Sequence, residues 1–502
     1  MSDVYRLGQV AGAGLFGVVG LGLGGPLGAG AGLTLGLLLF VARCRGLTPW
    51  SWAALWMRRN RRMTPAPLVT VGNDRSTGGV RYQDGTVVAA VQLLGRAHQP
   101  TLLDGPGEAR SANVLALEDL LPLMRQSLGL RIESMSVVCA GSRRQAGGDY
   151  PQVYDTLIGT SHYAGQREAW LMVRIRCIDN GDALGPRITA GTAALAAAQR
   201  IASALRCAGV RARVATATDI TDLEKRLGMS GLQSRNRGWR SVRADSSFLT
   251  TYACRPCDIS TATLAGMWSL RGDGIIQNLT ILGDGRACAT VTVRTARPPA
   301  GIPATLLRTL PGRQAQALAA NFCGPRPSLP GVALRPLPPN VVVGIGPSGV
   351  LLGKLADGSR MALPLGDPSA SSHIQLAVDD TIAKRVVIRA AATGERITVH
   401  TVDPERWASV RMANVTVIGR SRPDPGTTIS VVDGSVVPAP RPATVISVGE
   451  HTASGSDRAD IVIAQTDGPD LRVHTDWSVY DVEMELFRAE NRYAPTGLLI
   501  RR

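Results

Sequence analysis

The chain has 502 residues, enough for about three domains of ordinary size and for a large hydrophobic core. Apolar residues make up 44% of it and charged residues 19%, which excludes intrinsic disorder and a transporter with many membrane spans. The formal net charge is +16, and nearly all of the basic residues are arginines, a bias typical of a GC-rich bacterium. Eight scattered cysteines with no framework spacing indicate that most of the chain lies in a reducing cytosol.

The N-terminal region from Leu7 to Ala42 contains no charged residue. As one helix it would be about 54 Å long, whereas the hydrocarbon core of a bilayer is ~30 Å thick. Gly24-Gly25-Pro26 predicts a break, so we expect a two-helix transmembrane hairpin with spans at about 7–24 and 27–42. Arginines follow the second span and the turn has no charge, so the positive-inside rule predicts a multi-pass plasma-membrane protein with both termini and its large domain in the cytoplasm.

Residues 1–62 contain two sets of candidate membrane residues. Glycines at four-residue spacing are typical of membrane helices that pack closely, although GC-rich codon usage also fills an ordinary span with glycine. Tryptophans followed by arginines predict an amphipathic helix in the headgroup layer, and we favour lipid over nucleic acid as its ligand because it adjoins the spans. The predicted helix-packing residues are Gly24, Gly28, Gly32 and Gly36. The predicted lipid-anchoring residues are Arg43, Arg45, Trp50, Trp52, Trp56, Arg58, Arg59, Arg61 and Arg62.

Residues 63–324 are expected to form a cytosolic α/β domain. Asp84-Gly85 between apolar runs predicts a β-hairpin over residues 79–93. Amphipathic periodicity predicts helices at about 115–128, 188–207 and 219–227. Further strands are expected at 132–139, 168–177, 210–217, 248–253, 275–282 and 287–295. This mixture of hairpins and helices predicts a mixed α/β region and not a regular βαβ series.

Six prolines within residues 325–340 predict a stiff linker to a second cytosolic module at 341–502. Strands are expected at 341–344, 349–355 and 361–365. A strand at 374–378, a helix at 381–392 that ends at Gly394, and a strand at 397–401 form a plausible βαβ unit. We therefore expect a Rossmann-like C-terminal module followed by a β-rich tail.

Two motifs raise the question of catalysis. The loop from Gly344 to Gly349 matches G-x-G-x-x-G, but a β-hairpin pattern follows it where a dinucleotide site needs a helix. Cys254 and Cys257 have the spacing of half a zinc site or a redox pair, and no second pair accompanies them. We expect no catalytic residue, no cofactor and no metal. The alternative is a membrane-tethered nucleotide-binding enzyme that uses the Gly344–Gly349 loop.

These features together resemble the EccE family, a membrane component of the actinobacterial type VII (ESX) secretion systems. The resemblance rests on the Gly/Ala-rich hairpin with its arginine-rich flank, on the α/β region 79–295, and on the sequences GVLLGKLADGSRMALPL (349–365), RVVIRAAATGERITVHT (385–401) and DPERW (403–407). It implies a non-enzymatic subunit of a membrane complex that assembles with EccB, EccC and EccD and binds no nucleic acid. EccC is the ATPase of that machine, which fits the lack of a phosphate loop here.

Overall fold

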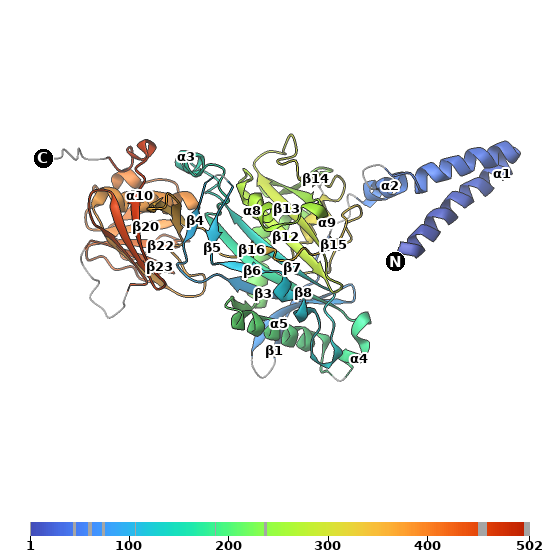
Figure 1. The fold of residues 1–502 in the computed structure, drawn as a ribbon, viewed down its shortest axis with the longest axis horizontal. Helices are drawn as coiled ribbons and strands as arrows, with labels where there is room; N and C mark the ends of the chain where they lie inside the picture. Colours follow the sequence, from blue (N-terminus) through green and yellow to red (C-terminus); the bar gives the residue numbers. More distant parts are fainter. Residues whose placement is uncertain are drawn as a thin grey trace.

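A computed structural model describes residues 2–43, 47–58, 63–72, 76–105, 107–185, 187–234, 238–449 and 459–495. It has a helical N-terminal extension, a central sheet with helices around it, and a second sheet at the far end (Figure 1). The soluble part is rich in sheet, and the predicted mixed α/β class is confirmed.

The central sheet is antiparallel at every strand pairing within the described residues. Its order is β1-β2-β3-β8-β7-β12-β13-β11-β10, with β9, β14 and β15 paired at its sides. The predicted hairpin is confirmed as β2 and β3 around Asp84-Gly85, both in positive φ. The strands are β1 (Leu68–Gly72), β2 (Thr77–Gln83), β3 (Thr86–Leu94), β7 (Ser134–Ser142), β8 (Gln166–Arg176), β9 (Arg211–Val214), β10 (Val242–Ala244), β11 (Ser247–Cys254), β12 (Gly274–Leu282), β13 (Arg286–Thr295), β14 (Leu307–Thr309) and β15 (Arg335–Pro336).

Helices cover both faces of the central sheet. One face packs against α5 (Ala190–Cys207) and α8 (Thr261–Gly266). The other packs against α6 (Ala217–Leu227), α7 (Ser230–Gln233) and α9 (Gln314–Ala319). Because both faces are covered, β3 is apolar almost throughout. Capping boxes at Thr189 and Thr216 begin α5 and α6, close to where the sequence predicts these helices.

The second sheet is mixed and differs from the Rossmann-like module that we expected. Its order is β21-β20-β22-β23-β19-β24-β25-β26-β17-β18-β4-β5, parallel from β21 to β24 and antiparallel beyond. Of its parallel strands, β19 and β20 are joined by α10 (Asp380–Thr393), which Asp379 caps and Gly394 ends at φ 117°. Loops or 3₁₀ turns make the other described connections, so the alternation of a doubly wound fold is missing. The strands are β4 (Thr101–Leu103), β5 (Arg110–Ser111), β17 (Val350–Lys354), β18 (Arg360–Leu363), β19 (Ser372–Ala377), β20 (Ile397–Thr401), β21 (Val415–Ile418), β22 (Ile429–Asp433), β23 (Thr444–Val448), β24 (Ile461–Gln465), β25 (Asp470–Thr475) and β26 (Val479–Met484).

The two sheets exchange segments. Strand β4 pairs with β18, β5 pairs with β4, and α3 (Asp149–Ile158) packs on α10, so these early residues complete the second core. In return, β16 (Val342–Gly344) pairs with β6 (Val114–Ala116). The 325–340 stretch is fixed to the central sheet where β15 pairs with β13. We expected separate domains at 63–324 and 341–502. That these two parts of the chain form separate domains stays a prediction.

The helix expected at 115–128 is wrong. Residues 114–116 form β6, and single 3₁₀ turns follow at Glu118–Leu120, Pro122–Met124 and Ser127–Gly129. The backbone N–H of Leu117 bonds to Val341 at 3.0 Å, and Leu115 and Leu117 are fully buried. Pairing with a distant strand thus overrides the local helical periodicity. The short helix α4 (Gly181–Leu184) packs beside the last of these turns.

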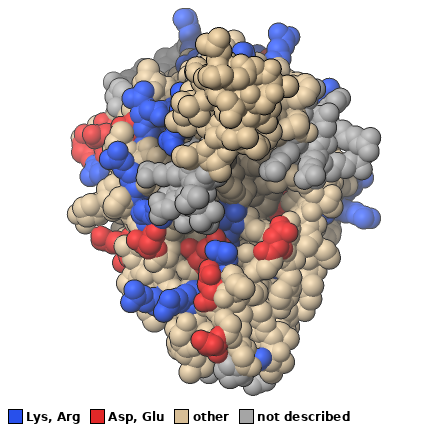
Figure 2. Space-filling model, turned by 90° about the vertical axis from the view of Figure 1, so that its right-hand side faces the viewer, with Lys and Arg blue, Asp and Glu red and all other residues tan. Residues whose placement is uncertain are grey.

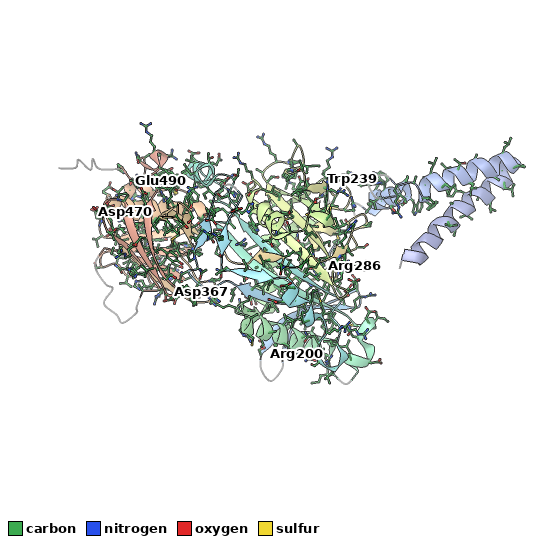
Figure 3. The ribbon with its side chains drawn as sticks, in the orientation of Figure 1. Arg200, Trp239, Arg286, Asp367, Asp470 and Glu490 are labelled. Carbon is green, nitrogen blue, oxygen red and sulfur yellow. The ribbon has the colours of Figure 1, made fainter. Side chains whose placement is uncertain are left out.

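A buried ionic cluster fixes the C-terminal segment to α10. Arg385 and Arg389, one turn apart, both bond to Glu490, and none of the three side chains is exposed. The hydroxyl of Tyr150 donates to the same carboxylate at 2.6 Å. Glu490 lies at the end of the second sheet, beside α10 (Figure 3). Burial alone would raise the pKa of Glu490, but bonds from Arg389, Tyr150 and Arg385 hold that pKa below its usual 4.5.

Removing this carboxylate leaves two buried guanidiniums without a counter-charge. We expect Glu490→Gln to lower the free energy of unfolding at pH 7 by roughly 3 kcal/mol, while the exposed control Glu483→Gln changes it little. Because the folded pKa is depressed, this stabilisation is complete above pH 4.5 and is lost as the pH falls through the folded value. Thermal unfolding of both variants between pH 3 and pH 7 measures it. A difference that does not change with pH contradicts the assignment.

Candidate membrane-anchoring site

Helix α1 (Ser2–Phe40) is the one helix in the described part of the chain that is long and apolar enough to cross a membrane, over Val10–Phe40. Its backbone leaves the helical region at Gly24 (φ −146°, ψ 23°) and Gly25 (φ 61°, ψ −150°), just before Pro26. The chain reverses at this bend, and two arms lie side by side (Figure 1). The separate helices expected at 7–24 and 27–42 are therefore assigned as one bent element. Two membrane crossings stay a prediction.

Small residues lie where the two arms of α1 meet. A Cβ added at Gly28 would overlap the backbone of Gly20, and one at Gly32 would overlap the backbone of Phe16. At Gly36 an added Cβ would lie 2.7 Å from the backbone of Ala13. Only glycine allows the backbones to approach this closely.

Gly24 does not belong to this contact. It lies at the bend, and nothing lies within 4 Å of an added Cβ. Gly20 takes its place between the arms, although the predicted set omits it. The four-residue spacing extends to Gly20, but the bend decides which glycines face the other arm.

The outer surface of α1 over residues 10–40 is apolar and free of charge. Leu23 and Leu27, next to the bend, are 86% and 89% exposed. Seen from the side of this extension, the protruding region carries no charged side chains, whereas charges of both signs lie on the surface around and below it (Figure 2). A helix surface that is apolar over residues 10–40 is unfavourable in water and indicates contact with lipid or protein.

Helix α2 (Pro49–Arg58) follows α1 and packs against it. The hydroxyl oxygen of Thr48 accepts a bond from the backbone N–H of Ser51 at 3.3 Å, and Pro49 takes the first helical position. The ring of Trp50 lies 5.5 Å from that of Phe40, which lies 6.0 Å from that of Phe16. The aromatic rings thus link α2 to both arms of α1.

Trp52 joins α2 to the soluble part of the chain. Its ring centroid lies 5.8 Å from that of Trp239, and the guanidinium of Arg313 lies 5.9 Å from the Trp52 ring. Gly312 leaves room for the Trp239 ring, since an added Cβ would lie 2.7 Å from it, and the Gly312 N–H donates to the Trp239 carbonyl at 2.7 Å. Trp239 lies on the side of the soluble region that faces α2 (Figure 3). Sequence analysis missed this contact because no periodicity links residues so far apart.

The structure describes some of the predicted lipid-anchoring residues and not others. Arg43 is exposed, and Trp50 and Trp56 are 52% and 56% exposed. Trp52 is turned toward Trp239 instead of outward. The Arg58 side chain and the residues Arg45, Arg59, Arg61 and Arg62 lie outside what the structure describes. A lipid-binding role for the whole set stays a prediction.

The Gly344–Gly349 loop is filled by the protein itself. The Arg167 Nε–H donates to the Gly346 carbonyl at 2.6 Å, and Gly344 lies against the same guanidinium. Gly349, at φ 81°, packs against the backbone of Leu363, and the hydroxyl of Tyr163 donates to its carbonyl. Strand β17 follows, as the sequence predicts, and no helix begins there to receive a pyrophosphate. These glycines therefore make close contacts within the fold.

The Cys254 thiol shows no sign of activation. Burial, with Asp258 and Cys257 nearby, raises the pKa of Cys254 to about 11, so its thiol stays protonated at neutral pH. Across the described residues, no group of three or more His, Cys, Asp or Glu side chains is placed to hold a metal ion.

Comparisons with known proteins identify relatives for most of the chain. Residues 163–254, from the start of β8 to the end of β11, match a family model named EccE, described as a type VII ESX secretion system translocon. The chain is 45% identical over 484 residues to the ESX-2 secretion system protein EccE2 of Mycobacterium tuberculosis (strain CDC 1551 / Oshkosh), covering 92% of this chain and 90% of the relative. It is 25% identical over 243 residues to the ESX-5 secretion system protein EccE5 of Mycobacterium marinum (strain ATCC BAA-535 / M), covering 44% of this chain and 58% of the relative.

Because the two arms of α1 pack closely, we expect a large side chain to be tolerated at Gly30 and not at Gly32. Gly32→Leu places a side chain into the other arm and should separate the arms, whereas Gly30→Leu points into open space and should be tolerated. Cysteine cross-linking between positions 17 and 33 reports the packing in membranes, because a Cβ added at Gly17 lies 3.6 Å from the Cβ of Leu33 and fits without overlap. We expect cross-linking to persist in Gly30→Leu and to be lost in Gly32→Leu. Equal cross-linking in both variants would show that the arms do not pack through this face.

The Trp52–Trp239 contact predicts that Trp239→Ala loosens α2 from the soluble part. A packed aromatic pair contributes about 1 kcal/mol of stability in addition to the free energy gained by burying its apolar surface. Trp239→Ala removes this contribution. Amide hydrogen exchange over residues 49–58 should therefore be faster in Trp239→Ala than in the native chain. Trp477→Ala, which removes another half-exposed tryptophan, is the control and should leave this segment unchanged. Unchanged exchange in Trp239→Ala would mean that Trp52 does not hold α2.

Proposed function

Because this chain belongs to the EccE family of type VII (ESX) secretion system components, we propose that it is a non-enzymatic structural subunit of the membrane complex. In this role it is anchored in the plasma membrane and docks onto the other core components. The observation that carries the proposal is the aromatic contact from α1 through α2 to Trp239, because it gives the soluble part a fixed attachment to an apolar helical hairpin.

We propose that the two arms of α1 cross the membrane twice. Residues 2–23 and 26–40 correspond to lengths of about 33 Å and 22 Å at 1.5 Å per residue, against a core of ~30 Å. Residues 41–43 extend the shorter arm. The remaining difference between its length and the thickness of the hydrocarbon core costs little free energy. Close packing through Gly20, Gly28 and Gly32 supports two arms held together in lipid.

The basic flank after α1 supports an orientation with both termini and the soluble part in the cytoplasm. Arg43 and the arginines at 45, 58, 59, 61 and 62 follow the second arm in the sequence, in the same stretch as Trp50 and Trp56, whose rings are half-exposed. This combination is typical of a helix in the headgroup layer that binds anionic lipid. Trp52 then fixes the soluble part at a set distance from the membrane.

The end of the central sheet near α4 supports docking onto another subunit. Leu128, Ile178 and Ile188 are 76%, 82% and 91% exposed, and they lie on the turns around α4 and just before α5. Leu128 is also held at φ 58°, a conformation that is costly for leucine. Arg187 and Arg200 flank it, both bonded to Ser127, and neither forms an ion pair within the described chain. An apolar tip with free positive charge fits an acidic, apolar surface on a neighbouring component of the EccB, EccC or EccD type.

The Gly344–Gly349 loop favours a scaffold over a nucleotide-dependent enzyme. Its carbonyls and the space beside its glycines are occupied by Arg167, Tyr163 and Leu363. Nothing in this arrangement presents backbone N–H groups at a helix N-terminus, which is what phosphate recognition needs there.

Purification in mild detergent through a C-terminal tag tests the proposal. We expect the native chain to elute within a large assembly that contains the secretion ATPase. Ile188→Asp should reduce the recovered assembly at least tenfold, because a buried, unpaired charge at an interface costs several kcal/mol. Ile302→Asp, at another exposed isoleucine, should not reduce it. An isolated monomer from the native chain, or equal losses in both variants, contradicts the proposed docking.

A further inference from the structure

A cavity of about 300 Å³ lies where the central sheet, the β6–β16 pair and the β4–β5 strands meet. Its walls come from β4, β5, β8, α8 and β16, so it touches both sheets. Arg110, His162 and Arg167 are its ionisable residues, and no Asp or Glu lines it. Hydroxyl groups of Thr101, Ser111, Thr261 and Ser348 and the apolar side chains of Leu264 and Trp268 complete the lining.

Arg167 is half-buried and differs from most of the buried arginines in the described chain, although Arg313 also has no acidic partner and bonds to one carbonyl, that of Pro330. Arg81, Arg385 and Arg389 are each paired with a buried glutamate. Arg174 has no carboxylate but reaches three backbone carbonyls and the Ser136 hydroxyl. Within the described chain, Arg167 has a single hydrogen-bond acceptor, the Gly346 carbonyl.

No acidic group compensates the charge of Arg167. Burial lowers its pKa to about 10, and the opposing influence comes from the Cys139 thiol. At neutral pH the side chain is therefore still a cation. It lies over the Trp268 ring, 5.1 Å from its centroid, and this contact leaves the guanidinium edge without a counter-charge. A half-buried cation that is not paired in this way is stabilised by a bound group that supplies negative charge.

Thr101 is a second, independent sign of a missing partner. Its side chain is 3% exposed, and its Oγ1 atom has no hydrogen-bond partner. A buried hydroxyl without a partner is rare in folded proteins, because its desolvation is not compensated. Thr101 and Arg167 come from different sheets and line the same cavity.

We propose that this cavity binds the oxyanion group, phosphate or carboxylate, of a small ligand, with Arg167 as the charged donor and Thr101 as a hydroxyl donor. Arg167 also lines the larger crevice of about 570 Å³ between the sheets, but Glu168, Asp273 and Glu395 make that side unfavourable for an anion. Because its two donors belong to different sheets, the bound anion holds the sheets together. This role is independent of the proposed scaffold function.

The full chain, purified in detergent, is titrated with sodium phosphate, sodium acetate or sodium chloride at constant ionic strength. Thermal unfolding and tryptophan fluorescence are the measurements, since Trp268 lies against Arg167. We expect a saturable rise of the unfolding midpoint with phosphate or acetate and none with chloride. Saturation by phosphate alone identifies a phosphate ligand, and saturation by acetate alone identifies a carboxylate. No saturable change with either anion overturns the proposal.

Substitutions separate this site from other arginines. Arg167→Met should abolish the anion response without lowering the midpoint in anion-free buffer, because it removes an uncompensated charge. Arg226→Met, on the crevice side, should respond as the native chain does. Thr101→Val is nearly isosteric and removes a hydroxyl that makes no bond within the described chain, so it should fold and weaken the apparent affinity about fivefold. An unchanged response in Arg167→Met and Thr101→Val contradicts the site even if one of them is less stable.

Discussion

The contact between Trp52 and Trp239 fixes the N-terminal helices to the soluble part of the chain. An apolar hairpin on a flexible tether would leave the soluble part free to move, whereas a packed aromatic pair with Arg313 beside it fixes α2 to the central sheet. Trp50 and Phe40 fix the same helix to α1. If the chain is anchored as we propose, α2 couples the membrane helices to the soluble part through side-chain contacts.

The soluble part can act as one body because its sheets are interlocked. Residues 101–111 leave the central sheet to complete the edge of the second, and β16 returns to pair with β6. The buried Glu490 then closes the C-terminal segment over α10. The scaffold role that we propose needs this kind of rigidity.

Local signals in the sequence predicted those elements that local chemistry determines. Asp84-Gly85 requires positive φ and therefore predicts the β2–β3 turn, and Gly394 ends α10 for the same reason. The periodic apolar residues of 188–207 predicted α5. The uncharged stretch 7–42 and its Gly24-Gly25-Pro26 break predicted where α1 bends, though not which glycines face each other.

Long-range pairing explains what the sequence did not predict. Leu115 and Leu117 belong to a stretch for which amphipathic periodicity predicts a helix, but they lie beside Val341 and β16. The Rossmann-like module is not confirmed, because loops connect most of the parallel strands that the structure describes. Trp239, Arg167 and Glu490 acquire their roles only from partners distant in the sequence. The strong arginine bias concealed the few buried arginines, such as Arg385 and Arg389, among many exposed ones.

Cysteine labelling in intact cells tests most directly whether the hairpin spans the membrane with the soluble part inside. Leu27→Cys lies next to the bend and is exposed, and the native Cys207 and Cys257 are exposed on the soluble part. A maleimide that cannot cross membranes should label Leu27→Cys in intact cells and should reach Cys207 and Cys257 only after lysis. Labelling of Cys207 or Cys257 before lysis, or of Leu27→Cys only after it, contradicts the proposed anchoring.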